Sequence, residues 1–373
     1  MAPAVIDVRS AEDTRDVVHR AVQAVVEGKL VAFPTETVYG VAASALDERA
    51  VSRLIAVKGR PEGQSLTLAV RSPAEARDYA PQMSPLAQRL ARRCWPGPVT
   101  LVVDDSHPES LVKQLPDAVQ RVVSPEGRVG LRVPGHQMVL DVLKLVAGPL
   151  VLSSANRSGQ PDARTAQEVL QTIGEDLDLV LDDGPCRFGQ PSSVVRVEGQ
   201  RYEILRQGVV PEATLKRLSS LLILFVCTGN TCRSPMAEGL ARKSLAVRLG
   251  CSPEELDDRG VIVASAGVAA MMGGRASPEA VEVLARQGVS LRDHETQPLS
   301  EPLIRHADVI FTMSRAHRDA IIAQWPSAAE RTRLLARSGA DIFDPIGGPP
   351  ERYQRCAEQI RAELEAQLEE FQW

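Results

Sequence analysis

The stretch LLILFVCTGNTCRSPMAEGL, residues 221–240, joins an apolar run, a polar loop and the start of a helix. Residues 221–226 contain no polar side chain, which predicts a strand buried on both faces, as in a parallel sheet. Pro235 then begins a helical pattern, since a proline in the first turn leaves no N–H group unpaired. A strand, a tight loop and a helix start together favour an anion, because backbone N–H groups and the helix dipole point at it.

Two side chains in this loop carry chemistry suited to phosphate. Cys227 directly follows the apolar run, and a thiol in such a place loses its proton more readily than a free thiol. Arg233 has a planar guanidinium group that matches two phosphate oxygens. The loop therefore predicts a thiolate nucleophile beside a phosphate-binding arginine.

The segment FVCTGNTCRSPMAE closely resembles the active-site loop of low-molecular-weight protein phosphatases. The resemblance implies that Cys227 attacks phosphorus to give a cysteinyl-phosphate, and that Asp344, in the segment DPIGG, protonates the leaving group. It also implies that Ser234 donates to the thiolate and that Asn230 braces the loop. Cys232 is either a disulfide partner for Cys227 or a buried filler. The implied supporting residues of the loop are Thr228, Gly229, Asn230, Thr231, Cys232 and Ser234.

Within that family, the residues around the loop resemble the protein-arginine phosphatase branch. Tyrosine-specific relatives tend to have a larger aliphatic residue at the position of Thr231 and a tyrosine after the Asp-Pro pair, where this chain has Ile346. We therefore expect phosphoarginine to be favoured over phosphotyrosine. An arsenate reductase would need further cysteines to relay electrons, and the sequence has none between Cys251 and Cys356.

Length and composition indicate two globular domains. The chain has 373 residues, of which 44% are hydrophobic and 24% charged. The net charge is −5; residues 219–373 hold 17 Lys and Arg against 21 Asp and Glu, which gives −4 and leaves −1 for the first part. Neither part could coat nucleic acid, so an RNA contact would need a local patch. We see no signal peptide, no membrane-spanning run and no disulfide framework among six cysteines, and we expect a cytoplasmic protein without a membrane partner.

Helical and strand patterns alternate along the chain, which predicts the α/β class. We expect domains at 1–210 and 221–373, joined by a short linker at 211–220. The first would be a twisted mixed-sheet α/β domain and the second a flavodoxin-like domain with four parallel strands. Ser10 with Asp13 predicts a capped helix start. Further predicted helices cover 48–58, 166–173 and 315–324, and predicted strands include 30–33, 193–197 and 309–312.

Four motifs in the first part combine small hydroxyl or amide groups with isolated cations. They are PTETVYG (34–40), KGRP (58–61), GLRVPGH (130–136) and SSANRSG (153–159). Hydroxyls and amides at strand ends suit a small polar substrate at the edge of a sheet. The cations are spread along the sequence, but if gathered in space they could neutralise a triphosphate. These cations are Lys58, Arg60, Arg132 and Arg206.

Together with WPGP (95–98), PSSVV (191–195) and ILRQG (204–208), these motifs resemble the threonylcarbamoyl-AMP synthase (YrdC-like) family over residues 17–208. The resemblance implies synthesis of threonylcarbamoyl-AMP from L-threonine, bicarbonate and ATP, with pyrophosphate released. The product would feed a tRNA threonylcarbamoyl transferase machinery that modifies tRNA adenosine. Mg²⁺ is expected with ATP, without a metal cage from protein side chains.

The same resemblance assigns roles to individual residues. Thr35 would lie at the threonine site, Lys58 and Arg60 would hold phosphates, and Arg206 would contact nucleotide phosphate. The threonine and adenylate pocket would be lined by Arg132, Ser153, Ser154, Asn156 and Ser192. The leading interpretation is a bifunctional enzyme. The alternative is an RNA-binding YrdC-like module with a regulatory or inactive phosphatase domain, and pyrophosphate release that requires threonine and bicarbonate separates the two.

Overall fold

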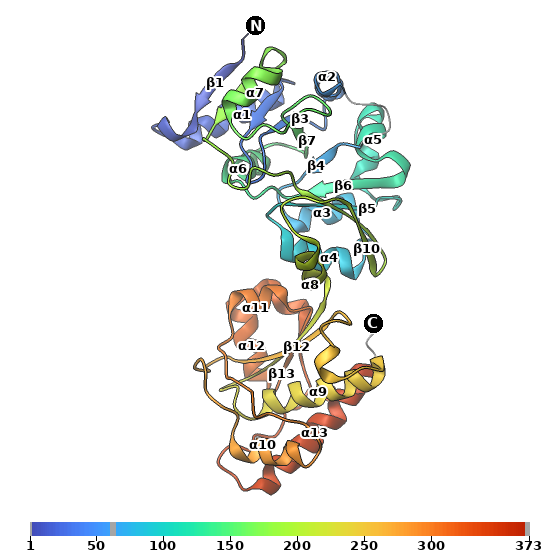
Figure 1. Ribbon diagram of the computed structural model, residues 1–373, viewed down its shortest axis with the longest axis vertical. Coiled ribbons are helices and arrows are strands. Elements are labelled where there is room, and N and C mark those ends of the chain that lie inside the picture. Colours follow the sequence, from blue (N-terminus) through green and yellow to red (C-terminus); the bar gives the residue numbers. More distant parts are fainter. Residues whose placement is uncertain (1, 60–64, 370–373) are drawn as a thin grey trace. The chain divides into compact units, whose positions relative to one another are not determined.

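The computed structural model describes residues 2–59 and 65–369, so the predicted phosphate ligand Arg60 lies outside the described residues. The chain divides into two compact units, Met1–Leu218 and Ser219–Trp373 (Figure 1). Each unit has its own sheet and its own hydrophobic core. Among the described helices, none is long and apolar enough to cross a membrane.

The first unit is built on a mixed sheet in which parallel and antiparallel pairs alternate irregularly. The strand order is β1-β8-β2-β3-β7-β4-β6-β5-β9-β10. The strands are β1 (Ala4–Asp7), β2 (Val31–Phe33), β3 (Gly40–Ser44), β4 (Thr67–Ala69), β5 (Val99–Asp104), β6 (Arg128–Arg132), β7 (Leu150–Ser154), β8 (Leu179–Asp182), β9 (Ser193–Glu198) and β10 (Arg201–Arg206).

Helices cover both faces of this sheet, because alternate strand residues are apolar on each side. Leu30 and Ala32 join the core under α2 to α5 and α7, whereas Val31 and Phe33 join the core under α1 and α6. The helices are α1 (Thr14–Val26), α2 (Glu48–Lys58), α3 (Pro73–Tyr79), α4 (Pro85–Cys94), α5 (Asp117–Val123), α6 (Gln137–Leu145), α7 (Ala166–Ile173) and α8 (Glu212–Ser219).

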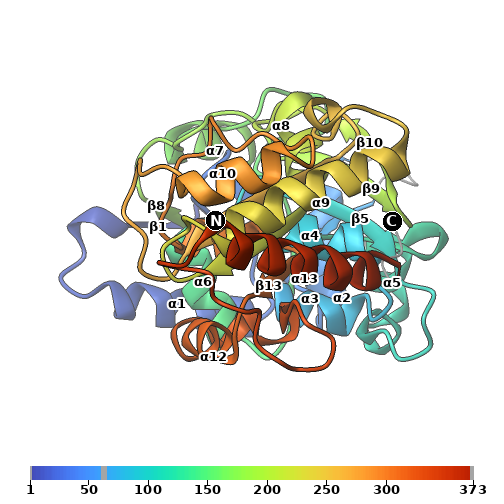
Figure 2. The same cartoon turned by 90° about the horizontal axis from the view of Figure 1, so that it is seen from below.

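The second unit has a four-stranded parallel sheet in the order β12-β11-β13-β14. Helices α9, α10 and α13 lie side by side on one face (Figure 2), while α11 and α12 pack on the other. The elements are β11 (Leu221–Cys227), β12 (Val261–Gly267), β13 (Val309–Thr312), β14 (Thr332–Leu334), α9 (Arg233–Leu249), α10 (Pro278–Ala285), α11 (Glu301–His306), α12 (Arg315–Gln324) and α13 (Pro350–Glu369).

The predicted α/β class is confirmed, with one mixed sheet and one parallel sheet. The prediction of a helix cap at Ser10 is wrong: Asp13 caps α1 by accepting a bond from the Arg15 N–H, and Ser10 lies in a short 3₁₀ turn. The segment predicted as a linker forms α8, whose Leu215 is buried in the core of the first unit. The elements that we did not predict are β1, β3, α3, α5, α11 and β14.

Candidate functional sites

A small polar pocket lies in the first unit where several strands end. Its wall combines threonine and serine hydroxyls with two guanidinium groups, and strand β3 contributes Gly40. A Cβ atom on Gly40 would lie 2.8 Å from a methyl group of Leu152, so a larger residue here would require the Leu152 side chain to move. The predicted site residues that line the pocket are Thr35, Arg132, Ser153, Ser154, Ser192 and Arg206.

Arg132 is held in a buried ion pair that we did not predict. Its Nη2 lies 2.6 Å from Glu36 Oε1 and donates to Thr37 Oγ1 at 3.0 Å. The second oxygen of Glu36 accepts from the Gly135 N–H at 2.8 Å. Both charged residues are less than a tenth exposed. Glu36 therefore fixes the orientation of Arg132 and balances its charge; its place in the motif PTETVYG, alone between two threonines, was the available signal.

Arg206 reaches the same pocket from the last strand of the sheet. Its guanidinium group donates to Ser192 O at 2.8 Å and to Ser192 Oγ at 3.0 Å. Burial of the guanidinium group lowers the pKa of Arg206; the charge of Asp162 opposes this shift, and that of Arg132 adds to it. The mutual influence of the two arginines reflects their convergence on one pocket, as anion binding would require.

Lys58 contacts residues of the pocket wall and of the loop next to it. The Lys58 ammonium group donates to Ser154 O at 2.6 Å and to Asn156 Oδ1 at 2.7 Å, and the residue is buried. Asn156 Nδ2 in turn donates to Gln160 O at 2.6 Å. In this structure Lys58 thus shapes the loop after β7 and does not line the pocket, so its predicted role as a phosphate ligand stays a prediction.

Two further local features shape the pocket: the hydrogen bonds of Thr35 and the close backbone approach at Gly208. Thr35 Oγ1 donates to Val38 O at 2.6 Å and accepts from the Thr37 N–H at 3.1 Å, so the loop after β2 is folded around this hydroxyl. A Cβ atom on Gly208 would lie 2.4 Å from Pro191 O. The chain after β10 can therefore lie against the loop that carries Ser192 only because residue 208 is glycine.

The second candidate site is the loop between β11 and α9. Cys227 Sγ lies 3.0 Å from Ser234 Oγ. Asn230 adopts a left-handed backbone conformation with φ of 55°, which asparagine tolerates better than most residues. Asn230 Nδ2 donates to Ser234 Oγ at 2.9 Å and to Ser265 Oγ at 2.8 Å. Ser234 Oγ also donates to Ala266 O at 3.3 Å, so the hydroxyl lies between the sulfur atom and this backbone carbonyl.

Arg233 and Asp344 meet at the mouth of this loop. Arg233 Nη2 lies 2.5 Å from Asp344 Oδ2, although the two residues are more than a hundred positions apart. Arg233 is 8% exposed, whereas the Asp344 side chain is 44% exposed. The structure therefore brings together the nucleophile loop, its arginine and the predicted acid.

Several residues that we did not predict support the loop. His317 Nε2 lies 2.9 Å from Thr228 Oγ1 and its Nδ1 lies 2.9 Å from Ser314 Oγ, so this residue of α12 is held in place by the loop on one side and by Ser314 on the other. Burial lowers the pKa of His317, and the charge of Arg233 lowers it further. Ser265 Oγ donates to Glu238 Oε2 at 2.7 Å, and burial raises the pKa of Glu238. Glu238 ends the quoted segment FVCTGNTCRSPMAE, whereas His317, Ser314 and Ser265 belong to no motif that we singled out.

Residues next to the loop's second cysteine are packed tightly. Cys232 is buried, its sulfur lies 3.4 Å from Ser277 Oγ and 3.5 Å from Thr231 Oγ1, and all described cysteines are free thiols. Thr231 O accepts from the Ser277 N–H at 2.9 Å. Gly229 lies beside Thr231, since a Cβ atom there would be 3.6 Å from Thr231 Oγ1. A disulfide between Cys227 and Cys232 stays a prediction.

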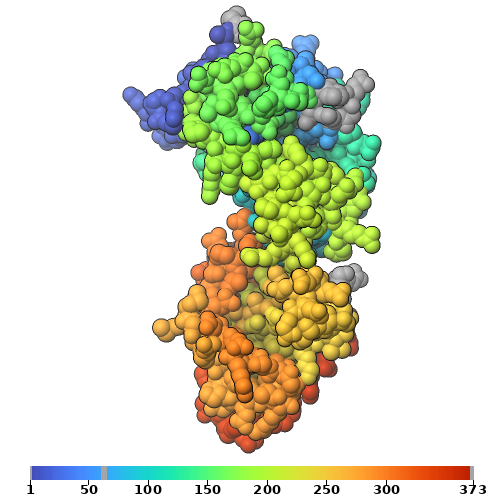
Figure 3. Space-filling model, viewed as in Figure 1, coloured from blue at the N-terminus to red at the C-terminus, as the bar shows by residue number. Residues whose placement is uncertain are grey.

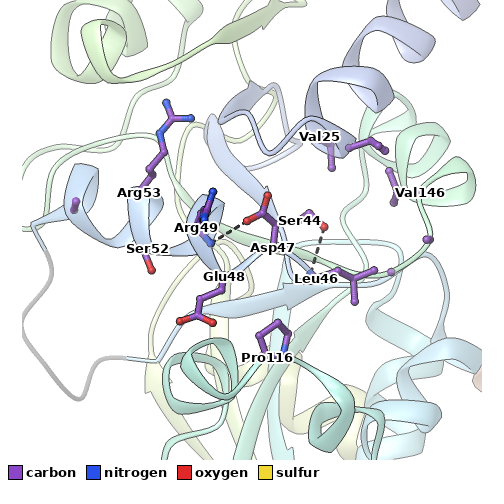
Figure 4. Close-up of a pocket in the computed structure, with 14 residues that line it drawn as sticks. Val25, Ser44, Leu46, Asp47, Glu48, Arg49, Ser52, Arg53, Pro116 and Val146 are labelled. Carbon is purple, nitrogen blue, oxygen red and sulfur yellow. Dashed lines mark hydrogen bonds between the residues drawn. The ribbon is translucent and has the colours of Figure 1, made fainter.

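A wider hollow of the first unit lies elsewhere, with a volume of about 1120 Å³. Figure 4 shows Val25, Leu46 and Val146 on its wall together with Asp47 and residues of α2. Asp47 accepts from the backbone N–H groups of Arg49 and Ala50 and so caps α2. The Asp47 carboxylate at this hollow is thus explained by helix capping.

A polar pocket under two arginines on a mixed sheet, and a cysteine loop at the end of a parallel sheet, define two classes of enzyme domain. Residues 23–208 match the family model described as Telomere recombination, Sua5_yciO_yrdC, and residues 222–372 match Low molecular weight phosphotyrosine protein phosphatase. The chain belongs to the Sua5/YrdC family in its first unit, and this domain is fused to a low-molecular-weight phosphatase domain.

Individual relatives support this assignment. A Mycobacterium tuberculosis protein, named provisionally as a threonylcarbamoyl-AMP synthase, is 36% identical over 190 residues, which are 51% of this chain and 83% of that protein. The Threonylcarbamoyl-AMP synthase of Pyrococcus abyssi is 36% identical over 193 residues, 52% of this chain, but the chain spans only 54% of that relative.

Two solved structures are also similar. A substituted form of P. abyssi Sua5 matches with a TM-score of 0.52 and 27% identity, covering 70% of this chain and 91% of that one. A Bacillus subtilis YwlE structure is 36% identical, with a TM-score of 0.36, and covers 40% of this chain and 100% of that one.

Proposed function

We propose that the chain is a bifunctional enzyme. The first unit synthesises L-threonylcarbamoyl-AMP from L-threonine, bicarbonate and ATP, and the second hydrolyses phosphorylated proteins. The observation that supports the synthase most directly is the convergence of Arg132 and Arg206 on a pocket lined by hydroxyl groups. This combination suits a small zwitterionic substrate beside a polyanion.

In the synthase, the carbamate formed from threonine and bicarbonate attacks the α-phosphorus of ATP. A carbamate oxygen forms the new bond to phosphorus, the bond to the β-phosphate oxygen breaks, and pyrophosphate leaves. The carbamate is a weak nucleophile, so positioning and charge stabilisation supply most of the rate. Arg132, oriented by Glu36, and Arg206 stabilise the charge on the phosphates, while the Thr35, Ser153 and Ser192 hydroxyls hold threonine and nucleotide.

Mg²⁺ would accompany ATP and neutralise phosphate charge. The described residues include no group of three or more His, Cys, Asp or Glu side chains placed to bind a metal ion. Glu36, the carboxylate nearest the pocket's arginine, has both oxygens engaged. Within the described part of the chain, the phosphates themselves would therefore supply most ligands to a Mg²⁺ ion.

In the phosphatase, the Cys227 thiolate attacks phosphorus and the bond to the leaving group breaks. The Ser234 hydroxyl stabilises the thiolate, and the loop N–H groups and Arg233 hold the phosphate oxygens. Asp344 forms an ion pair with Arg233, so an arriving phosphate displaces the Asp344 carboxylate from Arg233. The displaced carboxyl group then takes up a proton and gives it to the leaving atom, and water later hydrolyses the cysteinyl-phosphate.

We infer further that phosphoarginine is the preferred phosphorylated residue. A bulky aliphatic side chain at position 231 would favour the flat ring of phosphotyrosine, whereas Thr231 places a hydroxyl group there. The threonylcarbamoyl-AMP produced by the first unit would pass to a tRNA threonylcarbamoyl transferase machinery. We propose accordingly that the protein acts in the cytoplasm.

Two assays test the two halves separately. The synthase is tested by pyrophosphate release in the presence of ATP, which should require both threonine and bicarbonate and should disappear in Arg132→Met. Tight RNA binding without this turnover would favour the alternative of an RNA-binding module. The phosphatase is tested on phosphoarginine and phosphotyrosine peptides of equal sequence, and Thr231→Ile should lose the preference for phosphoarginine. An unchanged preference in that variant would refute the role of Thr231.

A further inference from the structure

Large apolar side chains that remain exposed in the second unit are concentrated around the phosphatase loop. Within its described residues they are Val247, Val268, Met271, Met272 and Ile346. Met271 is 84% exposed and Met272 is 76% exposed, which is unusual for neighbouring large side chains. All except Val247 belong to segments that contact the loop, and we call Val268, Met271, Met272 and Ile346 the apolar rim.

The segment with the methionines is fixed against the backbone of the nucleophile loop. The Val268 N–H donates to Cys227 O at 2.9 Å, and the Ala269 N–H donates to Thr228 O at 2.9 Å. Thr296 Oγ1 donates to Met271 O at 2.6 Å. The backbone is therefore anchored while the methionine side chains face solvent; this segment belongs to the orange surface of the second unit in Figure 3.

Ile346 belongs to the second segment at the mouth of the loop. The Ile346 N–H donates to Asp344 Oδ1 at 3.2 Å, and Asp344 pairs with Arg233. Ile346 is 66% exposed. The apolar rim is thus carried by two separate segments, each connected by direct contacts to residues that hold phosphate or act on it.

The composition of the apolar rim indicates its partner. A cluster of exposed apolar groups beside a polar site marks a binding surface, and methionine adapts its shape to varied apolar side chains. The nearest charged pair along the chain, Arg275 and Glu295, is mutually neutralised at 3.6 Å. Within the described residues, the methionine segment therefore has no net charge nearby, and the cations at the Ile346 segment, Arg233 and Arg352, are both in contact with Asp344. These features favour an uncharged, apolar chain over nucleic acid or an anionic surface.

We propose that the apolar rim binds apolar side chains next to the phosphorylated residue, so that the substrates are unfolded or extended segments of phosphoproteins. Folded proteins bury most of their large apolar side chains. Single exposed apolar residues are common on folded proteins, but large apolar side chains on both sides of an accessible phosphate are expected mainly where the chain is unfolded or extended. This inference rests on the proposed phosphatase activity, and it adds the conformational state of the substrate.

The experiment compares two synthetic phosphopeptides with the full-length protein. They share one phosphorylated residue, flanked by leucine in one peptide and by serine in the other. The parent should show about tenfold higher kcat/KM for the leucine peptide, the ratio that corresponds to partial burial of one or two apolar side chains. The double variant Met271→Ser, Met272→Ser should turn over the two peptides equally.

Val247→Ser provides the matched control. Val247 is as exposed as the methionines but lies on α9, 14 residues after Arg233, or about 21 Å along the helix. This variant should keep the full preference for the leucine peptide. Equal kcat/KM for both peptides in the parent, or an equal loss of preference in Val247→Ser, would overturn the proposal.

Two parallel measurements separate this proposal from its alternatives. If sedimentation shows a dimer that the double methionine variant dissociates, the apolar rim covers a second copy of the chain and the proposal is wrong. Hydrolysis of p-nitrophenyl phosphate that depends on Cys227, without any flanking preference, refutes the apolar rim alone. Absence of that hydrolysis refutes the phosphatase function and the apolar rim with it.

Discussion

Replacing Glu36 by alanine removes one partner of the buried ion pair in the synthase pocket. Both Glu36 and Arg132 are less than a tenth exposed, so the substitution leaves a guanidinium charge in a poorly solvated place. Breaking such a pair costs about 3–5 kcal/mol. Since about 1 kcal/mol shifts Tm by about 2–4 °C in a domain of this size, the Tm of the first unit should fall by at least about 6 °C.

Calorimetry of the full-length protein measures this effect. The transition of the first unit is identified as the one that ATP and threonine move to higher temperature, since a ligand stabilises only the state that binds it. The matched control is Glu198→Ala, which breaks the exposed pair between Arg128 and Glu198, 2.7 Å apart. An exposed pair contributes about 0–1 kcal/mol. The control should therefore change Tm by no more than about 4 °C.

The same variant reports on function. Without Glu36, Arg132 loses the contact that sets its orientation, so kcat/KM for pyrophosphate release should fall at temperatures where the unit is still folded. The double variant Glu36→Ala, Arg132→Met should recover part of the lost stability but no activity, because it removes the unpaired charge together with the phosphate ligand. The reasoning would be refuted if Glu36→Ala and Glu198→Ala lowered Tm equally. It would also be refuted if the double variant lost as much stability as the single variants Glu36→Ala and Arg132→Met together.

The remaining predictions concern single contacts. Ser234→Ala should lower the phosphatase kcat about tenfold or more, because a hydrogen bond to a charged group contributes about 1.5–3 kcal/mol; unchanged kcat would contradict the 3.0 Å contact with Cys227. Asp344→Asn should lower kcat about 10²- to 10⁴-fold on poor leaving groups and strengthen inhibition by inorganic phosphate, since Arg233 loses its internal partner. Because burial lowers the pKa of His317, the folded state resists protonation, so stability of the second unit should be fully present above about pH 6.5 and decline as pH falls below it; denaturant unfolding of His317→Gln should show a shallower decline. Gly208→Ala should abolish pyrophosphate release while the phosphatase of the same chain stays active, because the added Cβ would collide with Pro191 O; normal synthase activity would show that the loop can move aside.

The sequence allowed the fold class to be predicted because apolar periodicity and turn residues are local signals. Helices α2, α7 and α12 have the predicted bounds. Strand β3 was missed because GVAAS contains little β-branched or aromatic character, and its strand conformation depends on pairing with β2 and β7. Helix α8 was missed as part of the core because its only buried residue is Leu215. Both elements depend on contacts with residues that are distant in the sequence, and a short segment does not reveal such contacts.

The candidate sites could be predicted to the extent that their residues belong to compact motifs. Cys227 and Arg233 share one loop, and Arg132 and Arg206 follow recognisable strand ends. Glu36 and Glu238 stand inside quoted motifs, but their partners are far away in sequence, so only the fold reveals their roles; His317 lies outside every motif. Their charges are satisfied or suppressed by burial, which a linear sequence does not express.

Strand β11 pairs on both sides and is almost completely buried, and Cys227 is its last residue. The position of the sulfur atom is therefore fixed by the parallel sheet. Asp344, by contrast, belongs to a segment outside the helices and strands. Cys227 is 3% exposed, so an alkylating reagent should label it when the loop and the Asp344 segment move apart, while the sheet stays intact. Cys356, fully enclosed and with burial raising its pKa to about 12, should become labelled only when the unit unfolds, so the two thiols report separately on entry to the site and on survival of the fold.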